Sequence, residues 1–183
     1  METIKFRESA EQDLVGLLAV EERAFGETEG PVIVELVNDL LEDPTAKPLL
    51  SLIALHDRSI VGHILFTKAE VTVFAEVESA ILAPLAVEPG FQNRGVGGSL
   101  INEGLKRLSE VGVKLVFVLG HPSYYPKFGF EPAGRHGLDA PYPIPAAVED
   151  AWMIQELSPG YIGRIKGKVR CAEALDRPEH WSE

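Results

Sequence analysis

The sequence predicts a single domain of mixed α/β fold, with helices flanking a sheet. Three observations support this prediction: β-rich runs such as Leu49–Leu55 and Lys114–Leu119, apolar residues at helical spacing over Val96–Leu108, and a glycine-rich loop between a strand and that helix. The length of 183 residues and the apolar content of 45% suffice for one full hydrophobic core. We therefore expect residues 1–183 to form one domain.

The N-terminal segment predicts a strand followed by two helices. Ile4–Arg7 alternates as a short strand, and Ser9 with Gln12 forms a capping box at the start of the first helix. Gly26–Gly30 breaks that helix, and Pro31 is expected as the first residue of the second. In each predicted helix, residues recur three or four positions apart and so lie on one face. These are Leu14, Leu17, Leu18, Glu21 and Phe25 in the first helix, and Ile33, Leu36, Val37, Leu40 and Leu41 in the second.

The next segment predicts a hairpin and a long strand. Leu49–Leu55 and Ile60–Thr67 are β-rich, and the turn chemistry of His56–Ser59 joins them as a hairpin. Glu70–Val87 continues as strand, with a bend near Glu76–Glu78. These runs form the first half of the predicted sheet.

The second half of the chain returns to the sheet several times. Gly112 ends the helix over Val96–Leu108, and the apolar run within Lys114–Leu119 is typical of a strand buried on both faces. Pro122–Phe128 suits a short helix. Prolines, glycines and small residues make Pro132–Pro145 a long connection or lid.

The C-terminal residues predict two further segments. Ala151–Leu157 is expected as a strand, and Tyr161–Arg170 as a polar strand or part of a tail. We expect the core of the domain at about residues 1–160, with residues 161–183 as an extra strand or a C-terminal tail.

The loop between Val87 and Leu100 has the features of a pyrophosphate-binding site. Its glycines and Arg94 precede a helix, whose first backbone N–H groups are unpaired and lie at the positive end of the helix dipole. A P-loop requires a lysine that is missing after Gly97, and a dinucleotide fold requires a third glycine where Leu100 stands. Both of these nucleotide-binding classes are therefore excluded.

Two segments together resemble the GNAT superfamily of N-acetyltransferases. Leu85-Ala86-Val87 followed by Gln92-x-x-Gly95-x-Gly97 is similar to the acyl-CoA motif of that family, and Tyr124-Tyr125-Pro126-Lys127-Phe128-Gly129-Phe130 to its second signature. The run Leu119–Phe130 is similar to that of the YhbS-like predicted acetyltransferases. This resemblance implies a mostly antiparallel central sheet with a splayed parallel strand pair, and acetyl-CoA as the cosubstrate.

The resemblance also implies which residues hold acetyl-CoA. The strand pair would splay near Pro84, a residue that removes one hydrogen-bond donor from the sheet. Strand backbone would bind the pantetheine arm, and the loop would bind the pyrophosphate. The pantetheine residues would be Leu85, Ala86 and Val87; the pyrophosphate residues Asn93, Arg94, Gly95, Val96, Gly97 and Gly98, flanked by Gln92 and Ser99.

For catalysis, the resemblance implies direct attack of an amine on the thioester, with Tyr125 as the general acid for the CoA thiolate. A phenol with a pKa of about 10 is protonated at neutral pH and suits that role. The alternative is that the Tyr125 hydroxyl only anchors the loop or contacts CoA.

The general base is not given by the resemblance. The family's strand glutamate corresponds to Ile81, which cannot accept a proton. The base is therefore Glu78, Glu88 or water.

Composition limits the other partners. The formal net charge of −11 argues against nucleic-acid binding, and the sequence holds no apolar run long enough for a membrane helix. Cys171 is the single cysteine, and the five histidines lack the spacing of metal ligands, so we expect a cytoplasmic protein without a metal. The expected acceptor is a small-molecule or peptide amine, and the expected oligomeric state is a monomer or a homodimer. A non-catalytic acyl-CoA sensor or regulatory module is the alternative function.

Overall fold

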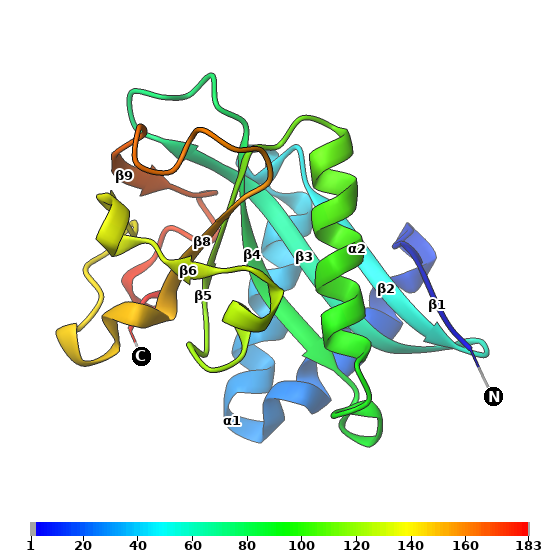
Figure 1. The fold of residues 1–183 in the computed structure, drawn as a ribbon. Coiled ribbons are helices and arrows are strands. Elements are labelled where there is room, and N and C mark those ends of the chain that lie inside the picture. The colour runs from blue at the N-terminus through cyan, green and yellow to red at the C-terminus, as the bar shows by residue number, and fades with distance from the viewer. Residues whose placement is uncertain (1–2, 183) are drawn as a thin grey trace.

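A computed structural model describes residues 3–182 and contains one twisted sheet between helices (Figure 1). Within the described residues the sheet has nine strands, and its main path runs β1-β2-β3-β4-β5-β8-β6. The strands are β1 Ile4–Glu8, β2 Leu50–His56, β3 Ser59–Val71, β4 Ser79–Val87, β5 Leu115–Leu119, β6 Glu131–Pro132, β7 Leu138–Asp139, β8 Trp152–Glu156 and β9 Gly167–Arg170. The helices are α1 Leu14–Glu42 and α2 Val96–Glu110.

The sheet is mostly antiparallel, as predicted. Along the main path every neighbouring pair is antiparallel except β4 and β5, which run parallel. Helix α2 covers one face of the sheet and α1 the other (Figure 1). Side chains of the strands alternate between these faces: Phe66 and Val116 pack with α2, whereas Ile81 and Phe117 pack with α1. The predicted mixed α/β fold with a parallel strand pair is confirmed.

The first two helices form one long helical element with a break. Gly26 has φ 85° and ψ −177° inside α1, so the predicted break is present. Helix resumes directly after Gly26, and Pro31 is therefore not the first residue of the second run. The predicted capping box at Ser9 and Gln12 is also wrong: the Asp13 carboxylate accepts from the Ala10 N–H at 2.7 Å, because the chain turns one residue later.

The long strand predicted over Glu70–Val87 is two strands. Strand β3 ends at Val71, and the chain leaves the sheet until β4 begins at Ser79. Val73 in this loop has a φ of 76°, which a regular strand does not allow. The apolar alternation between residues 71 and 77 therefore mimics a strand without forming one.

The C-terminal residues complete the α1 face of the sheet. Strand β9 pairs with β3 at Glu70 and Val71, and Trp181 is buried against Trp152 with ring centroids 5.6 Å apart. Trp152 in turn stacks on Phe117, with centroids 5.2 Å apart and planes 7° from parallel. This aromatic column fixes β8 beside β5.

Candidate active site

The parallel pair β4 and β5 separates partway along its length. Pairing joins Ser79–Leu82 to Leu115–Val118, and β5 then ends at Leu119 while β4 continues to Val87. Opposite β3, the register shifts so that Leu65 faces both Ala83 and Pro84. This irregularity at Ala83 and Pro84 lies at the point where the strands splay, and Leu85–Val87 pair with β3 but extend past the β5 ladder.

The loop after β4 carries the chain from the splay into α2. A turn at Pro89–Phe91 is followed by positive φ at Asn93 (61°) and Gly95 (82°). The first helical bond of α2 runs from the Ser99 N–H to the Gly95 carbonyl at 3.0 Å, so the N–H groups of Val96, Gly97 and Gly98 precede the helical ladder. These donors lie at the positive end of the α2 dipole, where an anion is favoured.

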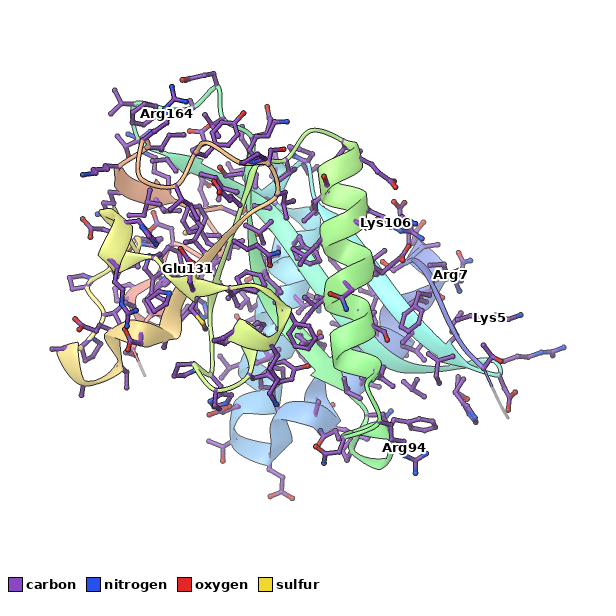
Figure 2. All side chains as sticks on the ribbon, viewed as in Figure 1. Lys5, Arg7, Arg94, Lys106, Glu131 and Arg164 are labelled. Atoms are coloured by element: carbon purple, nitrogen blue, oxygen red, sulfur yellow. The ribbon has the colours of Figure 1, made fainter. Side chains whose placement is uncertain are left out.

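Side chains of this loop divide into exposed and anchored groups. Arg94 is exposed, and its guanidinium lies 5.3 Å from the centroid of the Phe91 ring. Figure 2 shows it at the N-terminal end of α2. Gln92 points back to the strand, because its Nε2 donates to the Val87 carbonyl at 3.1 Å. The loop is thereby tied to the end of β4.

The second signature packs directly on the start of α2. A Cβ atom at Gly97 would lie 2.8 Å from the Tyr124 hydroxyl oxygen, and one at Gly98 would lie 2.8 Å from the Phe128 ring. Both glycines therefore permit a close approach that larger residues would prevent. The Lys127 ammonium lies 5.9 Å from the Tyr124 ring centroid and brings a second cation to this end of α2.

Tyr125 lies deeper than its neighbour Tyr124. Its side chain is buried, and its ring meets Phe130 and Tyr124 with centroids 5.7 and 5.2 Å away. Burial raises the pKa of Tyr124, which is only partly buried. The structure thus brings the tyrosine pair and the glycine loop together, although Tyr124 follows Gly98 by 26 positions in the sequence.

The two acids considered as bases do not meet at the splay. Glu78 is exposed and precedes the first residue of β4, at the opposite end of the strand from Val87. Glu88 follows Val87, but both of its oxygens accept from Arg23 of α1 at 2.7 Å. Ile81 is buried in the core. Neither glutamate is a free carboxylate beside the open edge of β4.

Comparison with known proteins agrees with this geometry. The family profile "Acetyltransferase (GNAT) domain" matches residues 5–133. The uncharacterized N-acetyltransferase YjhQ of Escherichia coli (strain K12) is 46% identical over 172 residues, which cover 92% of each chain. The chain belongs to the GNAT acetyltransferase family.

Solved GNAT structures have the same fold. The GNAT family N-acetyltransferase YhbS from Escherichia coli, in complex with CoA, matches with a TM-score of 0.87 and 29% identity, over 97% of this chain and 94% of YhbS. A GNAT family acetyltransferase from Brucella melitensis, in complex with acetyl-CoA, matches with a TM-score of 0.74 and 27% identity, over 96% and 100% of the two chains. The present GNAT chain is a CoA-dependent acetyltransferase, and acetyl-CoA is its cosubstrate.

The sequence prediction missed a buried polar chain under α1 of this GNAT domain. Glu21 and His63 are fully buried and hydrogen-bonded to each other, and His63 continues to Ser51. Burial raises the pKa of Glu21, and the hydrogen bond from His63 opposes this. A signal was present, since Glu21 occupies a position on the apolar face of the first helix. Nothing in the sequence joined it to His63, 42 positions away.

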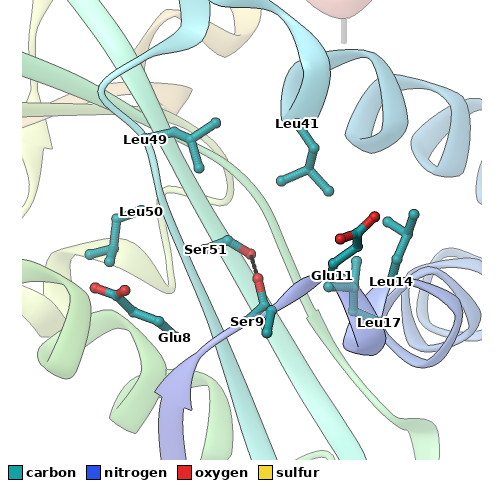
Figure 3. A pocket seen from close by; sticks show the side chains of 10 residues that line it. Glu8, Ser9, Glu11, Leu14, Leu17, Leu41, Leu49, Leu50 and Ser51 are labelled. Carbon is teal, nitrogen blue, oxygen red and sulfur yellow. Dashed lines mark hydrogen bonds between the residues drawn. The ribbon is translucent and has the colours of Figure 1, made fainter.

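The described surface of the GNAT domain contains a larger and a smaller cavity. One, of about 770 Å³, is lined by the connection predicted as a lid, including Arg135, Asp139 and Tyr142, and by Trp152 of β8. The other, of about 330 Å³, lies between the start of α1 and β2 and is lined by Ser9 and Ser51 (Figure 3).

The described part of the molecule has neither a cluster of metal-ligand side chains nor a membrane-spanning helix, and its single cysteine is partly buried. Residues 3–182 contain no group of three or more His, Cys, Asp or Glu side chains placed to hold a metal ion. Over the same residues, no helix is both long and apolar enough to span a membrane. Burial first, and the charge of Asp176 second, raises the pKa of the Cys171 thiol to about 12, so this cysteine is protonated at neutral pH.

Proposed function

We propose that this enzyme transfers an acetyl group from acetyl-CoA to the primary amine of a small molecule, by direct attack within a ternary complex. The splay of β4 from β5, with the start of α2 at its open end, is the observation that carries the proposal. An extended ligand beside β4 would find unpaired backbone groups, as an added strand does. A phosphate at the end of that ligand would reach the α2 N–H groups.

In this proposal each part of the cosubstrate meets a different type of group. The backbones of Leu85, Ala86 and Val87 hold the pantetheine amides, and the loop from Asn93 to Gly98 holds the pyrophosphate, with Gln92 and Ser99 on either side. Arg94 adds positive charge in a protein whose formal net charge is −11. The exposure of Arg94 supports a role on the phosphate rather than in the core.

The proposed reaction needs one acid and one base. The amine nitrogen attacks the thioester carbon, the carbon–sulfur bond breaks, and the Tyr125 hydroxyl gives its proton to the departing thiolate. The attacking nitrogen, positively charged once it is bonded to the acyl carbon, loses one proton to a base and becomes the neutral amide nitrogen, and Tyr125 is reprotonated from water. The position of Tyr125, packed against Tyr124 at the start of α2, supports its role as the acid.

We assign the acceptor to the cavity of about 770 Å³. Trp152 lines this cavity and also stacks on Phe117, the β5 residue paired with Ile81 of β4, so the cavity adjoins the face from which an amine would approach. Its volume falls in the range of small-molecule sites, about 300–1,000 Å³. Asp139 and Glu149 line it and would attract a cationic acceptor.

The test combines ligand binding with turnover. Acetyl-CoA should raise the melting temperature, whereas ATP and NAD should not, and thiol release with a panel of small amines should identify the acceptor. Tyr125→Phe should lower kcat about 100-fold while CoA affinity is kept, and Tyr124→Phe serves as the matched control. Absence of stabilisation by millimolar acetyl-CoA would overturn the proposal.

A second function is favoured by one observation, the presence of Ile81 where the family carries a glutamate. In that case the chain binds acyl-CoA without catalysis and acts as a sensor or regulatory module. Stabilisation by acetyl-CoA without thiol release across the whole amine panel would support the module and exclude the enzyme.

A further inference from the structure

Four polar side chains form a continuous hydrogen-bonded chain under α1. The Ser9 and Ser51 hydroxyls share a hydrogen bond of 2.6 Å, Ser51 Oγ lies 2.8 Å from His63 Nε2, and His63 Nδ1 lies 2.6 Å from Glu21 Oε1. Ser9 directly follows β1, and the other three residues, Ser51, His63 and Glu21, lie in β2, β3 and α1. Every link is within the range of a direct hydrogen bond.

The inner end of this chain is costly to bury. Glu21 and His63 are 0% exposed, and Ser51 is 7% exposed. Glu21 Oε2 is buried and has no hydrogen-bond partner among the described residues. An unpaired polar atom in the interior destabilises the fold by about 1–3 kcal/mol, so such atoms call for an explanation. A carboxylate oxygen left open is able to accept a proton.

This inner end lies beside the splayed strand. His63 is directly opposite Ala86 in the β3–β4 ladder, so the two side chains share the α1 face of the sheet. Adjacent strands are about 4.8 Å apart. The Glu21–His63 pair therefore lies one strand away from the backbone segment proposed to hold the pantetheine arm, on the face from which the acceptor would approach.

The outer end reaches a cavity. Ser9 and Ser51 line the cavity of about 330 Å³, and Figure 3 shows their hydrogen bond between leucines of α1 and of β2. Glu8 and Glu11 also line it. Ser9 is partly exposed, whereas Ser51 behind it is buried. The chain thus joins solvent in this cavity to a buried carboxylate.

We propose that Glu21, His63, Ser51 and Ser9 form a proton relay that accepts the proton of the attacking amine and releases it into this cavity. This inference rests on the proposed acetyl transfer. In it, Glu21 is the base, a role that Ile81 cannot fill. One proton enters at Glu21. The protonated carboxyl donates to Nδ1 of the His63 tautomer that carries its hydrogen on Nε2, His63 Nε2–H donates to Ser51, and Ser51 donates to Ser9, which releases one proton to water. His63 returns to that tautomer before the next turnover. Imidazole has two tautomers and each hydroxyl both donates and accepts, so the chain can take this order.

The electrostatic surroundings of the relay are simple. His63 is the group whose charge acts on Glu21, and the facing residues of β2 and β4, Ser51 and Ala86, are uncharged. Further along α1, Arg23 is paired with Glu88; Glu8 and Glu11 lie at the cavity. The pH dependence of turnover should therefore follow the Glu21 carboxyl.

Glu21→Gln and Ser51→Ala test the relay, with Ser79→Ala as a control because Ser79 is also a buried strand serine but lies outside the chain. Glu21→Gln should lower kcat about 100-fold at neutral pH with little change in the KM for acetyl-CoA. Its kcat should then rise with pH, while wild-type kcat levels off. Ser51→Ala should lower kcat by about tenfold and Ser79→Ala should not.

An unchanged kcat and pH profile in folded Glu21→Gln would overturn the relay. If that variant fails to fold, Ser51→Ala decides alone. A second readout does not need acetyl transfer: solvent exchange of the His63 ring proton, followed by ¹⁵N NMR, should slow at least about tenfold in Ser51→Ala. Unchanged exchange overturns the relay, whereas slowed exchange without thiol release overturns only the proposed function.

Discussion

The loop at the start of α2 and the polar chain under α1 lie on opposite faces of one sheet and are built in opposite ways. The loop presents backbone N–H groups from consecutive residues, with positive φ at Asn93 and Gly95. The polar chain uses side chains from four elements, which meet only in the folded protein. A site made from consecutive backbone leaves a local sequence pattern, whereas a site made from scattered side chains leaves almost none.

Of the substitutions that separate the backbone-built loop from the side-chain-built polar chain, replacement of a loop glycine should have the largest effect on CoA affinity. Gly97→Ala places a methyl group 2.8 Å from the Tyr124 hydroxyl oxygen, at the helix end proposed to hold the pyrophosphate. CoA affinity should fall at least about tenfold, equivalent to about 1.4 kcal/mol, in isothermal titration calorimetry. The glycine is needed for the close approach of Tyr124, so Gly97→Ala with Tyr124→Phe should regain part of the affinity.

Gly104→Ala is the matched control on the same helix. Its methyl group would lie 2.3 Å from the Phe66 ring in the core, far from the start of α2. Overpacking should destabilise the protein by about 1–3 kcal/mol, while the CoA affinity of the folded fraction is kept. Equal loss of CoA affinity in both variants would contradict a specific role for the loop.

The same contrast explains what the sequence could predict. The hairpin at His56–Ser59, the break near Gly26 and the glycine-rich loop before α2 all depend on local patterns, and the structure contains each of them. The short strands β6 and β7 were not predicted, because the prolines and glycines around them are typical of a connection. The turn after Val71 was missed because alternation in residues 71–77 continues through the loop. Likewise, the ion pair of Arg23 with Glu88 depends on how α1 crosses β4, which no local pattern encodes.

On the α1 face, the buried Glu21 carboxyl should make the stability of the folded protein depend on pH. Burial raises the pKa of Glu21, so the folded protein binds this proton more tightly than the unfolded chain. Wild-type stability should therefore decline as the pH rises through the unfolded pKa of Glu21 and level off above the folded pKa. Glu21→Gln removes this term, and its melting temperature relative to wild type should increase as the pH rises above about 4, the ordinary pKa of a glutamate.

Differential scanning fluorimetry across this pH range measures the effect. Glu78→Gln is the matched control, because Glu78 is an exposed glutamate before β4. Its melting temperature should follow wild type at each pH. A constant difference between Glu21→Gln and wild type would mean that Glu21 has the same pKa in the folded and unfolded chain.

The smallest effect is expected from Arg94, the one side chain of the loop proposed to act through its charge. Because it is exposed and stacked only on Phe91, its contribution is screened by water and salt. Arg94→Ala should weaken CoA binding about three- to fivefold, equivalent to about 1 kcal/mol or less. The difference should shrink as salt is raised from about 0.05 M to about 0.5 M, since the Debye length shortens. Arg94→Lys should retain most of the affinity if charge alone acts there, and a loss larger than that of Gly97→Ala would show that side chains, not backbone N–H groups, dominate the loop.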